Sequence, residues 1–353
     1  MRFSNKPTPL LIASAVCAVI LLLLFLGLLS SVDSTTRWSS GGQASVQHAA
    51  GYSASLSSKA EKGDEEVERA GNKTLGFGKV LVIGLKERSD KRDAMVLSSS
   101  LTGFEVEFMD AMRGEDVADK AQPPYIHIYV SQACIDLCLP AHNSVIESDL
   151  SSVLIMEDDM DWDIRLPSQM RDFAKGVRTI SGIPLTAPQA SPYGDDWDVL
   201  WPGHCGEART DDALPLLPSD PLYITHNDST VAPKAHLGWL HLLKDYPDGT
   251  RIVHRGVHPV CSFAYGVSRA GAQKLLAILA VQAWWNLAFD LQLAFACQQQ
   301  LLGLKCVSVE PMLFHHHRAA GAVGRDSDIK SAAAAVGEKE EGSYRGLGGR
   351  GNV

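Results

Sequence analysis

Short apolar runs rich in β-branched residues alternate with helical patterns through residues 79–329 of this chain. Lys79–Leu85 and Val153–Met156 have the length and composition of buried strands. Ser89–Leu101 and the segment that begins at Ser268 have a cap residue followed by the apolar spacing of a helix packed on one side. Strands that alternate with helices indicate an α/β fold with a mostly parallel central sheet covered on both faces. Ligands bind such sheets at the carboxyl ends of the strands.

The first residues predict a single membrane anchor. Leu10–Leu29 carries no charge, and a hydrocarbon core requires roughly 20 apolar residues. Arg2 and Lys6 precede this run, so the positive-inside rule places a cytosolic tail at residues 1–9 and the rest of the chain in the lumen. The expectation is a single-pass type II protein of the Golgi or endoplasmic reticulum membrane, with its span at residues 10–30. A signal peptide cleaved after Ser30 or Ser31 is the alternative.

Composition divides the rest of the chain into three parts. Residues 31–78 are rich in Ser, Gly, Ala and charge and are expected to form a flexible stem, and residues 331–353 a disordered tail. Residues 79–330 then form one α/β domain. Within it we expect further strands at Phe104–Met109, Trp197–Trp201, Cys261–Val267 and Lys305–Val309, and further helices at Ala141–Leu150 and Leu287–Leu301.

Charge and cysteine content narrow the possible partners and the compartment. The net charge of −9 argues against a nucleic acid partner, which requires a basic face. Six of the seven cysteines follow the apolar run, an even number that suits an oxidising compartment. Cys297 with Cys306 is the preferred pair, with buried free thiols as the alternative. Asn72 and Asn227 begin N-glycosylation sequons, which also arise by chance.

A cluster of acids directly follows the buried strand Val153–Met156. Five carboxylates fall within residues 157–163, beginning with Glu157-Asp158-Asp159. Strand alternation points Glu157 and Asp159 to one side and Asp158 to the other. Such concentrated charge requires a cation, and Mg²⁺ or Mn²⁺ held by carboxylates can bridge to the phosphates of a substrate. An acidic loop that caps the next helix is the alternative.

A histidine triplet, His315-His316-His317, follows the last predicted strand. Imidazole is a common ligand of Mn²⁺ and Zn²⁺. Because neighbouring side chains diverge, one or two of the three could face a single site. We therefore expect His315 or His317 to join Glu157 and Asp159 at the metal, and solvated or structural histidines are the alternative.

Two further acids are candidates for a general base. Asp290 stands alone among apolar neighbours on a predicted helix, where burial without a role would be costly. Its alternative is an acid favoured by the helix dipole. Asp198 is the second candidate, beside Trp197 and Trp201, whose ring faces suit sugar stacking. Trp197 is equally well explained as a core residue.

Six segments of the region carry motifs in a fixed order. They are Val82–Arg92, Cys138–His142, Leu154–Asp159, Asp196–Gly206, Phe263–Leu276 and Ser327–Ile329. The first looks like V-I-N-L-x-x-R-x-D-R, with Gly84 in place of the usual Asn, and the third matches L-[IV]-L-E-D-D almost residue for residue. In this order they resemble glycosyltransferase family 25, the group of lipopolysaccharide and collagen galactosyltransferase-like enzymes.

This resemblance implies a GT-A type, Rossmann-like fold and a metal-dependent, inverting hexosyltransferase. It implies a UDP-sugar donor, with galactose or glucose transferred to a glycan, protein or lipid acceptor. The residues that it places at the nucleotide-sugar are Arg88, Arg92, Asp158, Trp197, Ser327 and Asp328.

Two rival functions remain open. One is a non-catalytic sugar-binding or scaffold protein on the same fold, for which Gly84 leaves room. The other is a metal-dependent phosphoesterase, which would require a second cluster of acids and histidines to bridge two metals.

Overall fold

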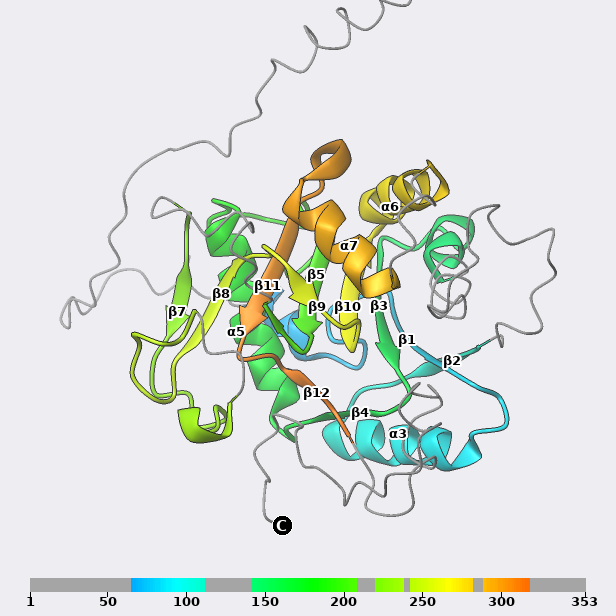
Figure 1. The fold of residues 1–353 in the computed structure, drawn as a ribbon, viewed down its shortest axis with the longest axis horizontal. Helices are drawn as coiled ribbons and strands as arrows, with labels where there is room; N and C mark the ends of the chain where they lie inside the picture. The colour runs from blue at the N-terminus through cyan, green and yellow to red at the C-terminus, as the bar shows by residue number, and fades with distance from the viewer. Residues whose placement is uncertain (1–64, 112–140, 208–219, 238–241, 282–287, 318–353) are drawn as a thin grey trace, which may run out of the picture. The chain divides into compact units, whose positions relative to one another are not determined.

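The computed structural model describes residues 65–111, 141–207, 220–237, 242–281 and 288–317. A sheet with the strand order β2-β1-β3-β10-β5-β11-β8-β7 runs through this part of the chain (Figure 1). Its strands are β1 (Lys79–Gly84), β2 (Glu107–Asp110), β3 (Ser152–Glu157), β5 (Val199–Gly203), β7 (Tyr223–Thr225), β8 (Arg251–Arg255), β10 (Ala264–Ser268) and β11 (Cys306–Glu310), extended by β4 (Met160–Trp162) and β12 (Phe314–His316). A separate ribbon pairs β6 (Gly206–Glu207) with β9 (Pro259–Val260).

The direction of the strands confirms an α/β fold with a largely parallel sheet. Along the main path, β10 and β8 run antiparallel to their neighbours, and all the other strands point the same way. The carboxyl ends of β1, β3, β5 and β11 therefore meet at one edge of the sheet. Functional side chains are expected at this edge.

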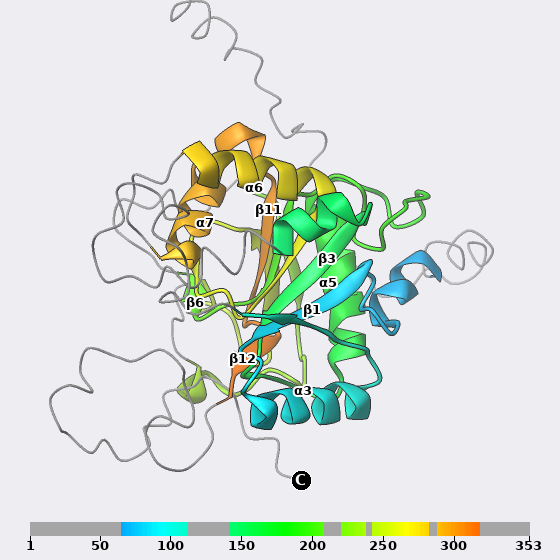
Figure 2. The same ribbon diagram turned by 90° about the vertical axis from the view of Figure 1, so that its right-hand side faces the viewer.

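Helices cover both faces of the sheet (Figure 2). The helices are α3 (Ser89–Thr102), α5 (Leu166–Ile180), α6 (Arg269–Val281) and α7 (Phe289–Gln298), with 3-10 turns η1 (Arg69–Gly71), η4 (Lys234–His236) and η6 (Leu301–Gly303). Because side chains alternate along a strand, Leu154 and Met156 pack with α5 and η1, whereas Val153 and Ile155 pack with α6 and α7. Burial on both faces explains why β3 is an unbroken apolar run.

The predicted helix start at Ser268 is confirmed by its cap. The Ser268 hydroxyl accepts a hydrogen bond from the Gly271 N–H at 3.0 Å, which satisfies one of the orphan donors at the first turn of α6. The predicted Ser89 cap is one residue out of place, because α3 begins at Ser89 and Arg88 takes the cap position. The Arg88 guanidinium instead donates to Asp90 in the first turn at 2.9 and 2.8 Å.

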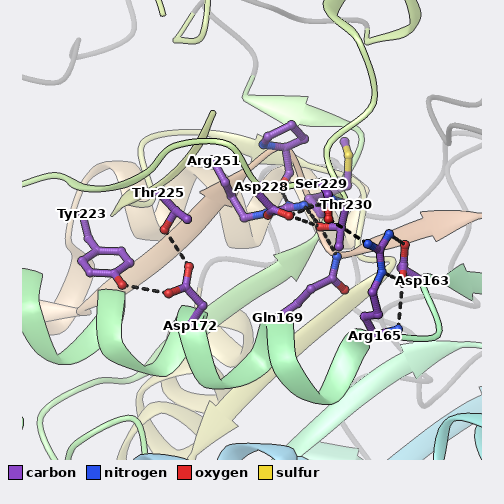
Figure 3. Close-up of polar contacts among 12 residues, drawn as sticks. Asp163, Arg165, Gln169, Asp172, Tyr223, Thr225, Asp228, Ser229, Thr230 and Arg251 are labelled. Carbon is purple, nitrogen blue, oxygen red and sulfur yellow. Dashed lines mark hydrogen bonds and ion pairs between the residues drawn. The ribbon is translucent and has the colours of Figure 1, made fainter. Parts of the chain in front are cut away.

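Polar contacts attach the edge strand β7 and the following loop to α5 (Figure 3). Asp172 of α5 accepts hydrogen bonds from the hydroxyls of Tyr223 at 2.8 Å and Thr225 at 2.6 Å. Earlier in the same helix, Gln169 donates a hydrogen bond to Thr230 at 2.7 Å. Arg251 of β8 pairs with Asp228 at 2.7 Å. The loop of residues 226–230 is thereby fixed between α5 and β8.

The predicted stem over residues 31–78 extends too far toward the C-terminus. A helical turn at residues 65–68 and η1 precede β1, and Val67, Ala70 and Leu75 are buried in the core beside α5. Arg178, fully buried on α5, pairs with Glu66 at 3.3 Å. The apolar residues in this segment are too sparse to be recognised as a core segment from composition alone.

A chain that starts at residue 79 is therefore expected to be less stable than one that starts at residue 63. The shorter chain loses the burial of Val67 and Leu75, which contributes on the order of 4 kcal/mol to the free energy of unfolding. Urea titration of the two truncated chains measures the difference. Equal midpoints would show that residues 65–78 do not stabilise the fold.

The predicted termini lie outside the described residues, as do one motif and part of another. These are the tail 1–9, the span 10–30, most of the stem, the tail 331–353, the motif Ser327–Ile329 and the segment Cys138–Pro140. No helix within the described ranges has both the length and the apolar character needed to cross a membrane. The predicted Cys297–Cys306 disulfide is confirmed, and Cys205 pairs with Cys261.

Candidate functional site

Glu157 and Asp159 lie at the carboxyl end of β3, where the sequence predicts them. Glu157 accepts a hydrogen bond from the Ser262 hydroxyl at 3.0 Å. Burial, together with the nearby charges of Asp159 and Asp290, raises the pKa of Glu157 to about 7. Three carboxylates from β3, the turn after it and the start of α7 are thus close enough to interact electrostatically.

The Asp159 carboxylate contacts an imidazole and an ammonium group. His316 Nε2 lies 3.0 Å and Lys91 Nζ 3.2 Å from its carboxylate. Burial would raise the pKa of Asp159, but the hydrogen bond from His316 and the charge of Lys91 outweigh it and lower the pKa. Asp159 is therefore held as an anion in a half-buried position, as a ligand of a cation has to be.

Asp158 lies against Gly84 of β1, and Lys91 links its carboxylate to that of Asp159. Asp158 is 8% exposed, and its carboxylate accepts from Lys91 at 2.9 Å. A Cβ on Gly84 would lie 2.2 Å from Asp158 Oδ2. Gly84 has no side chain, and this leaves room for the Asp158 carboxylate where it meets Lys91.

The loop before β10 completes the group. The Cys261 N–H donates to Asp290 at 2.9 Å, and the ring of Phe263 stacks on His316 with centroids 5.3 Å apart. Asp290 lies in the first turn of α7. Glu157, Asp159, Asp290 and His316, with Lys91 beside them, form what we call the carboxylate group.

The histidine beside Asp159 is His316, and the prediction of His315 or His317 is corrected. His315 is partly buried near Arg251, and burial and that charge lower its pKa to about 4. His317 is exposed, and its backbone N–H, not its ring, contacts Asp159. The cause is the pairing of β12 with β4, which sets His316 opposite Met160 and which the sequence alone does not reveal.

Asp198 and Trp197 lie away from the carboxylate group. Asp198 precedes β5 at the amino ends of the strands, where it pairs with Lys274 at 2.7 Å and accepts from the Lys305 N–H. Trp197 is 5% exposed and donates to the Gly194 carbonyl, packed edge-on against Phe77. Both side chains make structural contacts away from the carboxylate group, so neither is part of the candidate site.

The two predicted arginines lie near the ends of β1 and β2. Arg92 donates to the Gly84 carbonyl at 3.2 Å, pairs with Asp110, and lies 5.0 Å from the centre of the Phe108 ring. Arg88 pairs with Asp90 in the first turn of α3. Ser327 and Asp328, also predicted to bind the nucleotide, lie outside the described residues.

The donor set of the carboxylate group suits a divalent metal, although it is not arranged as a ligand cage. Within the described ranges, no group of three or more histidine, cysteine or acidic side chains lies in an arrangement that could hold a metal ion as it stands. Two carboxylates and one imidazole nevertheless converge, and this mixture suits Mn²⁺. Sequence analysis missed Lys91 and His316. The sequence signal for Lys91 is a basic residue in the first turn of the helix that follows the first strand, close to the carboxyl ends of the strands.

A second pair of acids is buried further along the same edge of the sheet. The Glu207 N–H donates to Glu310 Oε1 at 3.2 Å, and the His258 N–H donates to Glu207 Oε2 at 2.6 Å. Burial raises the pKa of Glu207 to about 7, and burial with the charge of Glu207 raises that of Glu310 to about 8. One Glu310 oxygen has no hydrogen-bond partner.

This pair predicts a pH-dependent stability. The folded chain retains protons on these two acids that the unfolded chain releases above pH 4.5, so the contribution of this pair to stability is greatest at low pH and decreases as the pH rises toward 8. Glu310→Gln removes one of these titrations and is expected to stabilise the fold at pH 8 by on the order of 2 kcal/mol, with little change at pH 5. Thermal unfolding at both pH values tests this, and an unchanged pH dependence would contradict it.

Comparison with known proteins adds no family assignment. No protein-family model matches this chain, and no curated protein matches it significantly.

Proposed function

We propose that this chain is a metal-dependent glycosyltransferase of family 25 with a GT-A type fold. It transfers a sugar from a UDP-sugar to a glycan, protein or lipid acceptor. UDP-galactose is the first proposed donor and UDP-glucose the second. The observation that carries the proposal is the convergence of Glu157, Asp159, His316 and Asp290 at the carboxyl edge of the sheet. The order of the six motifs supports it.

In this proposal Glu157, Asp159 and His316 hold Mn²⁺ or Mg²⁺. When bound, the metal neutralises the charge that develops on the leaving diphosphate. Arg92, at the ends of β1 and β2, is suited to bind phosphate oxygens of the donor. Asp158 and Lys91 keep the acidic turn in place beside β1.

Asp290 is the favoured general base for an inverting reaction. It takes the proton of the acceptor hydroxyl while the hydroxyl oxygen attacks the anomeric carbon and the bond to UDP breaks, so the nucleotide leaves with the electron pair. Its carboxylate is half-buried, and Oδ2 accepts a hydrogen bond from the Cys261 N–H. Within the described part of the chain this is its one hydrogen bond, which leaves Oδ1 for the acceptor.

A lumenal location is part of the proposal. The two disulfides of the described part support an oxidising compartment. With the apolar run Leu10–Leu29 as its anchor, the chain would be a single-pass type II protein of the Golgi or endoplasmic reticulum. Glycosylation at the exposed Asn72 and Asn227 would agree with this location.

One observation favours the rival of a non-catalytic sugar-binding protein. Lys91 already neutralises Asp158 and Asp159, in the position where a metal-dependent enzyme needs its ion. In that case the donor would bind without turnover and without metal.

The two functions are separated by incubating the detergent-solubilised full chain with Mn²⁺ and a panel of UDP- and GDP-sugars. Metal-dependent release of UDP from one sugar would establish a transferase and identify its donor. Donor binding that is unaffected by a chelator, with no release of nucleotide in the presence of candidate acceptors, would support the rival instead.

A further inference from the structure

One three-residue segment contacts three members of the carboxylate group. In the connector, residues 261–263 between β9 and β10, the Cys261 N–H donates to Asp290 at 2.9 Å. The Ser262 hydroxyl donates to Glu157 at 3.0 Å, and the Phe263 carbonyl accepts from the Glu157 N–H at 3.1 Å. The Phe263 ring stacks on His316. The relative placement of the candidate base and the candidate metal ligands therefore depends on this segment.

The connector is fixed from behind by a disulfide and an indole. Cys261 is bonded to Cys205, whose N–H donates to the Val260 carbonyl at 2.7 Å. The Cys261 carbonyl accepts from Trp201 Nε1 at 3.0 Å. Both Trp201 and Cys205 belong to β5 or the turn after it, so the central strand holds the connector in place.

The backbone of Cys261 shows that this conformation is imposed by its surroundings. Its φ angle is +68°, in the left-handed region that residues with a Cβ rarely adopt. Such conformations persist where neighbouring contacts over-determine them, and they concentrate at functional sites. This angle turns the Cys261 N–H toward Asp290 while the side chain is bonded to Cys205.

We propose that the Cys205–Cys261 disulfide is a positioning device, which sets Asp290 against Glu157 through the Cys261 N–H and the Ser262 hydroxyl. The proposal rests on the proposed transferase function. Cys261 touches neither donor nor acceptor in this account and acts through Asp290. Loss of the disulfide releases the connector, so the base moves relative to the anomeric carbon while the phosphate-binding edge at β1 is retained.

The chain supplies a matched control in its second disulfide. Cys297–Cys306 joins the last turns of α7 to the first residue of β11, at the amino end of that strand and away from the carboxylate group. Removing it also removes one cross-link from the same domain but leaves the contacts of residues 261–263 in place. It therefore reports the loss of a disulfide at the end of α7 opposite to Asp290, with the connector intact.

The experiment compares the full-length chain with Cys205→Ser/Cys261→Ser and Cys297→Ser/Cys306→Ser variants. The first variant is expected to lose at least about tenfold in kcat, with the donor KM changed by less than about threefold. The control is expected to retain kcat within about twofold below its own melting temperature. Equal kcat losses in both variants, or wild-type kcat in the first, would overturn the proposal.

Two further measurements cover the case in which the first variant does not fold or the wild type shows no turnover. Trp201→Phe keeps the disulfide and most of the ring volume but removes the hydrogen bond to Cys261, and a reduced kcat at unchanged donor KM is expected. Hydrogen exchange at the Cys261 amide is expected to accelerate at least about tenfold in the first variant or in Trp201→Phe, and not in the control. If the wild type shows no turnover but exchange is faster in these variants than in the wild type, the transferase function is refuted and the positioning is supported. If exchange at the Cys261 amide is the same in the variants and the wild type, the positioning is refuted.

Discussion

Asp159→Asn is expected to lower metal-dependent sugar transfer by at least about a thousandfold. Asp159 lies between His316 and Lys91, at the point where two carboxylates and an imidazole converge. The amide keeps the shape but removes the anion, so the site loses a charged ligand and the stabilisation that a bound metal gives to the leaving diphosphate. The effect is measured as the rate of nucleotide release in the presence of Mn²⁺, with the sugar nucleotide that the donor panel identifies.

The matched control is Asp161→Asn, two residues further along the same segment. Asp161 has a side chain that is 61% exposed and lies 3.9 Å from the His317 ring, outside the carboxylate group. Its loss is expected to change turnover by less than about twofold, because an exposed pair at this distance contributes little. Similar losses of turnover in both variants would show that activity depends on the total negative charge of this segment and not on Asp159 as a metal ligand.

Trp201→Ala is expected to lower the free energy of unfolding by about 3–5 kcal/mol. Trp201 is fully buried on β5, in the core layer between the sheet and the helices α6 and α7. Its ring lies near Tyr265, with centroids 6.4 Å apart, and its N–H is bonded to the Cys261 carbonyl. Truncation leaves a large cavity and an unpaired carbonyl.

Trp201→Phe separates these two contributions, since it retains an aromatic ring but loses the donor. It is expected to cost about 1–2 kcal/mol, less than half the cost of the alanine variant. Urea titration of the three chains gives the values. A loss in Trp201→Ala of under about 1 kcal/mol would mean that β5 is not packed as described.

Strands buried on both faces of the sheet are easier to predict from the sequence than short or polar strands near its edges. β1 and β3 are largely continuous apolar runs and β11 is buried along its whole length, because helices cover both faces of the sheet. The predicted strands match all three within a residue or two. β7, β8 and β12 were missed because they are short or carry charged and polar residues. α5 was also missed, although Leu166, Met170, Phe173 and Val177 show helical spacing.

The carboxylate group was only partly predictable for a related reason. Glu157, Asp159 and Asp290 stand out because acids at the ends of apolar elements are conspicuous. The choice of His316 over its neighbours depends on the register of β12 with β4, which is a long-range property. Asp198 is also an acid next to an apolar run, but it lies at the amino end of β5, where it pairs with Lys274.

The central claim is that the carboxylate group forms a metal-dependent site for a nucleoside diphosphate. Its most direct test is calorimetric titration of UDP into the full chain, with Mn²⁺ and with a chelator, for the wild type and Asp159→Asn. We predict that Mn²⁺ tightens UDP binding to the wild type at least about tenfold and that this gain disappears in the variant. UDP binding that is equally tight with the chelator, or no UDP binding with Mn²⁺, would contradict the account.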